Sequence, residues 1–314
     1  MGQTKQTNWI TKRIADTAEK ACTKSVSLLK AKNAAGFEDA VPKIRENFKS
    51  IRAALRLVRD DHKSYKKENE FYRDEAKKIL VVQQAIAMVK AVDLINEQYS
   101  ERLYKNAFTD LREKLETHKK KEIESALNEE HIFQEMRQNL DGKCGNFKDT
   151  LSKPLARETI VSGLKKVYER GRKAQKKLSD TSTNETIHEL QKRTNYLEIQ
   201  LALLSPIWSE MIDVWQAELQ KLSHLLLTSE ALNQLSGFLR DNSDTKAKEE
   251  GVYLMNTLIE GHKEQVQQHA VLSAQKIFSL KPKHFIKIFT TAWDAYNSES
   301  AQKILPSEKL KLSE

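Results

Sequence analysis

The sequence predicts an all-α protein made of long helices, and two observations support this fold class. Nine glycines and five prolines make up only 14 of the 314 residues, about 4.5% of the chain against roughly 12% in average proteins. Apolar residues recur with helical spacing along nearly the whole chain, and no segment shows sustained strand alternation. We therefore expect about eight to twelve helices with lengths suited to bundles.

A few sequence signals mark where these helices begin and end. The first break is the NAAG segment, 33–36, and Pro42 then follows Asp39 in the arrangement expected of a helix with proline in its first turn. The clearest interior break is the DGKCGN segment, 141–146, where two glycines fall close together. Further breaks are expected at 179–184, 205–206, 241–246 and 281–282, and the segment 60–64 is either a loop or a polar bend within a helix.

The DGKCGN segment divides the chain into two halves of similar length. We expect residues 1–150 to form a first helical bundle and residues 151–314 a second one. When the chain is shifted against itself by 146 residues, Val41–Arg59 lies over Ile187–Ser205 and their apolar positions agree. This match favours two tandem, pseudo-repeated four-helix bundles, although amphipathic helices resemble one another by default.

The charge balance favours anionic partners. Lysine and arginine number 53 against 44 aspartates and glutamates, which gives a formal net charge of +9. Such an excess describes the partners of a protein rather than its fold. Phosphate-type oxygens suit it well, because guanidinium offers paired planar donors and lysine a mobile point charge.

Five of these cations share one side of a predicted helix. Their spacing of 4, 3, 4 and 3 places them within about 80° of the helix circumference, and Glu46 lies about 100° away. A parallel apolar stripe runs beside them, so we expect the helix to bury that side and to expose a ridge of uncompensated cations. This basic stripe consists of Arg45, Lys49, Arg52, Arg56 and Arg59.

A second basic cluster lies on the segment Leu164–Lys177, where seven cations share fourteen residues with one acid, Glu169. These cations surround the helix instead of forming one stripe, so a solvated surface explains them as well as a binding site does. Between the two groups, Lys66, Lys67 and Arg73 add charge to the first half.

No catalytic or metal-binding constellation emerges from the sequence. The P-loop and nucleophile-elbow motifs are absent, and the eight histidines form no HxxxH pair. Two cysteines, Cys22 and Cys144, cannot make a disulfide framework or a four-ligand zinc site. We expect a protein that is not an enzyme and that needs no metal or cofactor. Trp208 and Trp215, seven residues apart, are expected to pack in the core of the second bundle.

The sequence also bears on the cellular compartment. The opening segment has no apolar core before a cleavage site, and the most apolar stretch, 79–92, is interrupted by Gln83, Gln84 and Lys90 and is too short for a membrane span. The low cysteine count fits a reducing environment. We expect a soluble, cytoplasmic protein.

At the basic stripe the sequence resembles the CHAD domain, a family of two related four-helix bundles that binds inorganic polyphosphate. Val41–Arg59 is similar to the first copy of the family's V-H-x-x-R-K-x-x-K-x-x-R helix, and Ile187–Leu204 resembles the second copy. The positions that match the family are Arg45, Lys49, Arg52, Arg56, Asn69, Arg73 and Asp74 in the first half and Lys165, Tyr168, Arg172, His188 and Lys192 in the second.

The chain also departs from the family pattern. Pro42 replaces the histidine of the first copy, and Glu46 replaces its second basic residue. In the second copy, Gln191 and Asn195 stand where the family prefers arginine and lysine, and Glu198 stands opposite Arg52 of the first copy, which reverses the charge. Elsewhere, Gln83 and Gln84 replace an Arg-Asp pair, and Glu230 and Ala231 stand where the family has histidine and aspartate. We therefore expect binding to depend mainly on the first bundle and the second basic cluster, or the ligand to have changed.

The resemblance implies a non-catalytic module that binds inorganic polyphosphate or a similar polyanion through a basic surface formed by both bundles. Phosphate or sulfate can occupy such a site, and the resemblance also implies an association with polyphosphate granules. The candidate binding residues are Arg45, Lys49, Arg52, Arg56, Arg59, Lys66, Asn69, Arg73, Lys165, Tyr168, Arg172, His188 and Lys192.

Two other functions remain open. A helical scaffold or granule-associated protein could dock acidic partners through the same cations. An RNA- or DNA-binding protein is also compatible with the charge, although few aromatic residues are interleaved with it for base stacking. Convergence of the basic stripe and the second basic cluster on one concave surface would favour polyphosphate.

Overall fold

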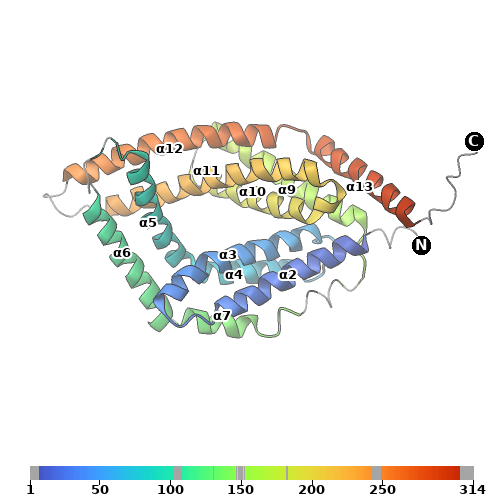
Figure 1. Ribbon diagram of the computed structural model, residues 1–314, viewed down its shortest axis with the longest axis horizontal. Coiled ribbons are helices and arrows are strands. Elements are labelled where there is room, and N and C mark those ends of the chain that lie inside the picture. The colour runs from blue at the N-terminus through green and yellow to red at the C-terminus, as the bar shows by residue number, and fades with distance from the viewer. Residues whose placement is uncertain are drawn as a thin grey trace, which may run out of the picture.

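The computed structural model describes residues 7–101, 103, 108–129, 131–145, 147, 151, 153–181, 183–241 and 249–304. Within these residues the chain forms eleven α-helices and no strand, which confirms the all-α fold class (Figure 1). The elements in chain order are α2 (Asn8–Leu28), α3 (Ala34–Leu57), α4 (Tyr65–Lys78), α5 (Leu80–Gln98), α6 (Thr109–Glu124), the π-helical turn η1 (Ser125–Glu129), α7 (Ile132–Leu140), α9 (Arg157–Asp180), α10 (Asn184–Leu204), the 3-10 turn η2 (Ser205–Ile207), α11 (Ser209–Asp241), α12 (Glu249–Ile277) and α13 (Pro282–Ile304).

The helix boundaries follow several of the expected breaks. The side chain of Thr183 caps α10 by accepting from the backbone N–H of Thr186. Helix α13 begins at Pro282, where proline loses no hydrogen bond because the first turn has no intrahelical acceptor for its N–H.

The expected start of a helix at Pro42 is wrong. The Asn33 side chain accepts from the N–H of Gly36 at 2.8 Å and starts α3 earlier, at Ala34. Pro42 therefore lies inside α3, where it leaves the carbonyl of Glu38 without its usual helical donor.

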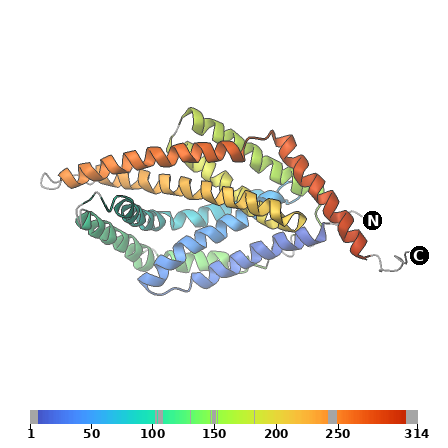
Figure 2. The same cartoon turned by 45° about the horizontal axis from the view of Figure 1, so that its top comes forward.

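Helices α3 and α10 lie side by side in the middle of the molecule (Figure 1). Helix α2 packs on α3, and α9 and α11 pack on α10, with α12 running along the outer side of α11. The start of α2 and the end of α13 lie at the same end of the molecule (Figure 2). Helices distant in sequence are thus brought together at the centre.

Two apolar clusters fill the interior. The larger one runs from Ile10 on α2 to Trp293 on α13 and includes residues from both halves of the chain. The smaller one lies at the opposite end, where Val92, Leu115, Leu232 and Met255 bring α5, α6, α11 and α12 together. The division into two pseudo-repeated bundles at about residue 150 stays a prediction.

A close approach fixes α9 against the end of α3. A Cβ atom on Gly163 would lie 2.3 Å from the carbonyl oxygen of Leu57, so only glycine permits this contact. Beside it, Lys166 Nζ lies 2.6 Å from a carboxylate oxygen of Asp60 and Ser162 donates to the same carboxylate at 2.7 Å. The pKa of Asp60 is lowered by these hydrogen bonds.

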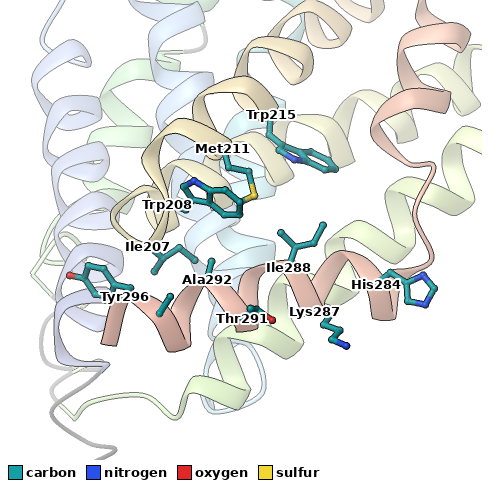
Figure 3. Close-up of a pocket in the computed structure, with 11 residues that line it drawn as sticks. Ile207, Trp208, Met211, Trp215, His284, Lys287, Ile288, Thr291, Ala292 and Tyr296 are labelled. Atoms are coloured by element: carbon teal, nitrogen blue, oxygen red, sulfur yellow. The ribbon is translucent and has the colours of Figure 1, made fainter. Parts of the chain in front are cut away.

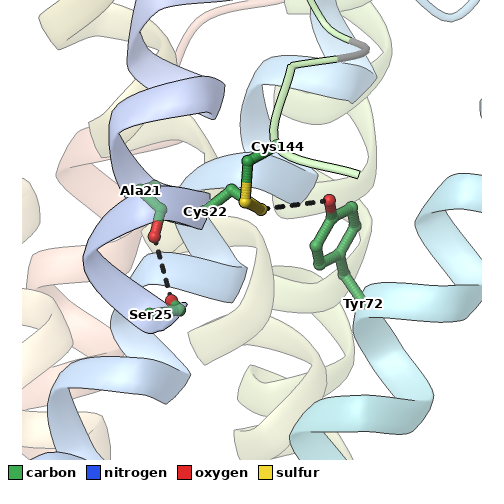
Figure 4. The surroundings of a disulfide bond; sticks show 5 residues. All are labelled: Ala21, Cys22, Ser25, Tyr72 and Cys144. Carbon is green, nitrogen blue, oxygen red and sulfur yellow. Dashed lines mark hydrogen bonds between the residues drawn. A yellow bond between two sulfur atoms is a disulfide. The ribbon is translucent and has the colours of Figure 1, made fainter. Parts of the chain in front are cut away.

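The two cysteines form a disulfide that the sequence analysis does not anticipate. Cys22 on α2 is bonded to Cys144 in the turn after α7, and the Tyr72 hydroxyl on α4 donates to Cys22 Sγ at 3.8 Å (Figure 4). Disulfides persist in oxidising environments and are rare in reducing ones. The disulfide is therefore evidence against the reducing compartment that we expected from the low cysteine count.

Trp208 and Trp215 differ in their surroundings. Trp215 packs against Phe285 with 5.3 Å between ring centroids, but Trp208 keeps 48% of its surface exposed. The expectation that both lie in the core is wrong for Trp208, which directly precedes α11 and lines a groove at the surface (Figure 3).

Among the described helices, no single one has the length and apolar content to cross a bilayer. Helices α4 and α5 meet the length and composition together, with a bend of 55° between them. Both also bury side chains in the core, including Tyr72 and Val92.

Candidate anion-binding groove

A groove of about 500 Å³ lies between α3, α4 and α5 on one side and α10 and α11 on the other. Six lysine or arginine side chains line it against two carboxylates, those of Glu46 and Glu230, and amide side chains supply much of the rest. The cations are Arg45, Lys49, Arg52, Arg73, Lys77 and Lys192. The groove is therefore predominantly positive and polar.

Arg45 and Arg52 keep donors free for a ligand. Arg45 Nη1 donates to the carbonyl oxygen of Ala76 at 2.5 Å, and Arg52 Nε donates to Asn69 Oδ1 at 3.3 Å. Neither guanidinium has a carboxylate of the described residues within 4 Å. Burial lowers the pKa of Arg45, Glu230 acts in the opposite direction, and the charge of Arg52 lowers it further. An anion entering the groove would relieve this repulsion.

The other cations of the groove are already paired. Lys49 Nζ lies 3.3 Å from a carboxylate oxygen of Glu46, which corrects the expectation that no acid reaches the basic stripe. Side chains three residues apart on a helix are neighbours on its surface, so the long side chains of a lysine and a glutamate can reach each other although they leave the helix in different directions. Likewise, Arg73 lies 2.9 Å from Asp74, and Lys192 lies 2.5 Å from Glu189.

Arg56 is not part of an exposed ridge. Its residue is only 6% exposed, and its guanidinium stacks on the ring of Tyr196 at 4.1 Å from the centroid. It donates to the carbonyl oxygen of Arg52 at 3.0 Å and makes a short hydrogen bond to Asn69. Burial lowers the pKa of Arg56. The prediction of a fully exposed stripe is wrong here, because α10 covers this part of α3.

Two further residues proposed from the sequence do not line the groove. Arg59 lies beyond the end of α3, with Nε 3.8 Å from Asp60, and burial lowers its pKa. Lys66 is exposed on the first turn of α4. By contrast, Asn69 takes part indirectly, because its amide oxygen holds both Arg52 and Arg56.

The residues proposed on α9 contact other helices instead. The buried hydroxyl of Tyr168 donates to the carbonyl oxygens of Ile277 and Leu280, and burial raises its pKa to about 12. Arg172 Nε donates to the carbonyl oxygen of Phe278 at 3.2 Å, and Lys165 is exposed near Glu169. The expectation that the basic stripe and the second basic cluster meet on one concave surface is therefore wrong for this groove, because the stripe faces α10 and α11 and no residue of α9 lines it.

The second half contributes His188 and Lys192 from α10, as the sequence suggested. His188 Nδ1 lies 3.5 Å from a carboxylate oxygen of Glu230, so the two helices α10 and α11 meet at the groove. Sequence reasoning missed Lys77, although it lies four residues after Arg73 and helical spacing could have found it.

Comparison with known proteins identifies a family for this chain. A family model described as the CHAD domain matches residues 21–239, more than half of the chain. The matched segment includes every groove-lining residue named above. No curated protein matches the chain. In the part of the chain that the structure describes, no group of three or more metal-ligating side chains is present.

Proposed function

The chain belongs to the CHAD domain family, and on this premise we propose that it binds inorganic polyphosphate or a similar polyanion in the groove between α3 and α10. The family is associated with polyphosphate binding and generally acts without catalysis. The observation that carries the proposal is that Arg45 and Arg52, without carboxylate partners, face a groove lined by four more cations.

The internal repeat supports this site. The shift of 146 residues pairs position 42 with 188, 45 with 191, 46 with 192 and 49 with 195, and all eight residues line the groove. Two helices from the two halves thus present equivalent positions to one space. This arrangement supports two related bundles that share a single site at their contact.

Each of these four pairs holds one basic residue. His188 stands opposite Pro42, Arg45 opposite Gln191, Lys192 opposite Glu46 and Lys49 opposite Asn195. Where one copy lacks a basic residue, the other copy has one at the equivalent position. The second copy is therefore expected to contribute to binding through His188 and Lys192, more than its departures from the family pattern suggest.

The groove suits an extended chain of phosphates better than a nucleic acid. Binding of single-stranded nucleic acid relies on aromatic rings exposed for base stacking. The aromatic ring at this groove, Tyr196, is only 1% exposed and is covered by Arg56. Phosphate oxygens need only the guanidinium and ammonium donors that the groove offers. Association with polyphosphate granules would follow from such binding.

A titration with long-chain polyphosphate and with short RNA, each at 50 and 200 mM salt, tests this proposal. We expect tighter binding of polyphosphate and a loss of about fifty- to hundredfold between the two salt concentrations, because each neutralised phosphate releases counterions. Equal affinity for RNA, or no binding of polyphosphate, would overturn the proposal.

A further inference from the structure

A second groove, of about 900 Å³, lies between the start of α11 and helix α13 and shares no residue with the anion-binding groove (Figure 3). Its lining is mainly apolar and aromatic, and its largest apolar and aromatic side chains are Ile207, Trp208, Met211, Trp215, Ile288 and Tyr296. Ligand pockets in proteins typically have about 300–1,000 Å³ and an apolar lining with a few polar groups. This groove has the size and composition of such a site.

On the α11 side, the wall of the groove packs against the hydrophobic core. Trp215 packs edge-on against Phe285, and Phe285 stacks on the buried Tyr168 with 3.8 Å between ring centroids. Trp208 has an extended backbone, with φ −170° and ψ 83°, and its N–H donates to the carbonyl oxygen of Ser205 at 3.3 Å. The half-exposed indole lines the groove and remains open to a ligand.

The wall on the α13 side carries one permanent cation, Lys287, at its rim. Figure 3 shows Ile288 and Ala292 facing the groove and His284 and Lys287, one turn apart, on the outer side of α13, with the Lys287 side chain pointing away from Trp208. No aspartate or glutamate among the described side chains lines the groove, and none of their carboxylates lies within 4 Å of Lys287 Nζ. An occupant with an apolar body and one negative group would complement both walls.

We propose that this groove binds a monomeric long-chain carboxylate. The hydrocarbon chain lies against Trp208, Met211 and Ile288, and the carboxylate lies at the α13 rim, where the flexible side chain of Lys287 turns to donate to it. Burial of the chain supplies most of the affinity, and the single cation selects the sign of the head group. The site is independent of polyphosphate binding, because the two grooves are lined by different residues.

Calorimetric titration with dodecanoate, below the concentration at which it forms micelles, tests the proposal. Dodecylammonium serves as the matched ligand of opposite charge. We expect dodecanoate to bind about tenfold more tightly, because one ligand is attracted and the other repelled by Lys287. Saturating polyphosphate should leave the dodecanoate affinity unchanged.

Matched variants locate the binding. Trp208→Ala should weaken dodecanoate binding by about tenfold or more, whereas Val214→Ala, at an exposed apolar side chain on the same helix outside the groove, should have no effect. Lys287→Glu should remove the preference for dodecanoate over dodecylammonium, and Lys283→Glu should retain most of it. Circular dichroism confirms that each variant is folded.

Three results would overturn the proposal. The first is equal binding of both amphiphiles by the unmodified protein. The second is dodecanoate binding that survives both Trp208→Ala and Ile288→Glu in folded protein. The third is absence of binding of monomeric dodecanoate. Attachment to phosphatidylglycerol vesicles, or a dimer that Trp208→Glu dissociates, would then identify the occupant as a membrane or a second copy of the chain.

Discussion

The guanidinium carbon of Arg56 lies 4.1 Å from the centroid of the Tyr196 ring, and this contact joins α3 to α10. Both residues are almost fully buried. Arg56 also donates to Asn69, which in turn accepts from Arg52 in the groove. A buried arginine thus holds the two groove-forming helices together and positions a neighbour that remains free to bind an anion.

Replacing Tyr196 with leucine tests the role of this stack. The variant keeps an apolar side chain in the core but leaves the guanidinium without its aromatic partner, so we expect the free energy of unfolding to fall by about 2 kcal/mol. Urea unfolding measures the change. Tyr253→Leu is the control, because Tyr253 is 76% exposed and its replacement should have little effect. Equal losses in both variants would show that the stack contributes nothing specific.

Replacing Glu230 with glutamine should strengthen polyphosphate binding. Glu230 lies in the groove beside His188 and acts on Arg45. Removal of this negative charge should raise the affinity about two- to fivefold at low salt. Fluorescence anisotropy with labelled polyphosphate measures it, with Asp213→Asn, at an exposed site of the same helix outside the groove, as control. An unchanged affinity would place the ligand away from Glu230.

The partly buried carboxyl of Glu198 should make the stability of the fold depend on pH. Burial raises the pKa of its carboxyl above the ordinary value of 4.5, against a hydrogen bond with Gln220 that lowers it. The folded protein therefore binds this proton more tightly than the unfolded chain does. This contribution is fully present below pH 4.5 and is lost as the pH rises through the raised value.

Glu198→Gln should remove the loss of stability that accompanies ionisation of this carboxyl as the pH rises. The free energy of unfolding at pH 7 should rise by less than about 1 kcal/mol, because solvent screens a partly exposed group. Denaturant unfolding across pH 4 to 7 measures the effect, and Glu218→Gln on α11 is the control. If Glu198→Gln kept the pH dependence of the unmodified protein, the burial of this carboxyl would not matter for stability.

Loss of the Cys22–Cys144 bond should lower stability substantially. The bond joins residues 122 positions apart, and closing a loop of that length is worth about 3–5 kcal/mol. Thermal unfolding of the Cys22→Ser, Cys144→Ser double variant should show this loss, and a reducing agent should lower the Tm of the unmodified protein alone. An unchanged Tm in the double variant would contradict the prediction.

The positions of helices were largely predictable from local signals. The break at the NAAG segment and the start at Pro282 depend on capping and on proline, which act within a few residues. The burial of Arg56 was not predictable in this way. An arginine at a stripe position is expected to be exposed unless a partner covers it, and Tyr196 comes from the other half of the chain.

The residues of the groove were also only partly predictable from local sequence signals. The spacing of Arg45, Lys49 and Arg52 predicted that they share a face, and the family match added His188 and Lys192. Local spacing does not show which helix lies opposite α3, because that depends on packing between distant segments, such as the contact that Gly163 permits. For this reason the sequence wrongly placed residues of α9 in the groove. In the structure, Tyr168 and Arg172 donate to the backbone of the segment between α12 and α13.

The affinity of groove variants for long-chain polyphosphate tests the central claim most directly. Arg52→Ala should weaken binding about tenfold or more, because it removes charge-assisted donors that have no carboxylate partner. Lys192→Ala, from the second half, should weaken it by a smaller but measurable factor. Lys177→Ala, at an exposed cation of α9 outside the groove, should change it by less than about twofold.

These three affinities, measured side by side at 50 mM salt, decide the question. The order expected from the structure is a large loss for Arg52→Ala, a moderate loss for Lys192→Ala and almost none for Lys177→Ala. If Lys177→Ala weakened binding more than Arg52→Ala, polyphosphate would bind on the surface of α9, and the groove between α3 and α10 would not be its site.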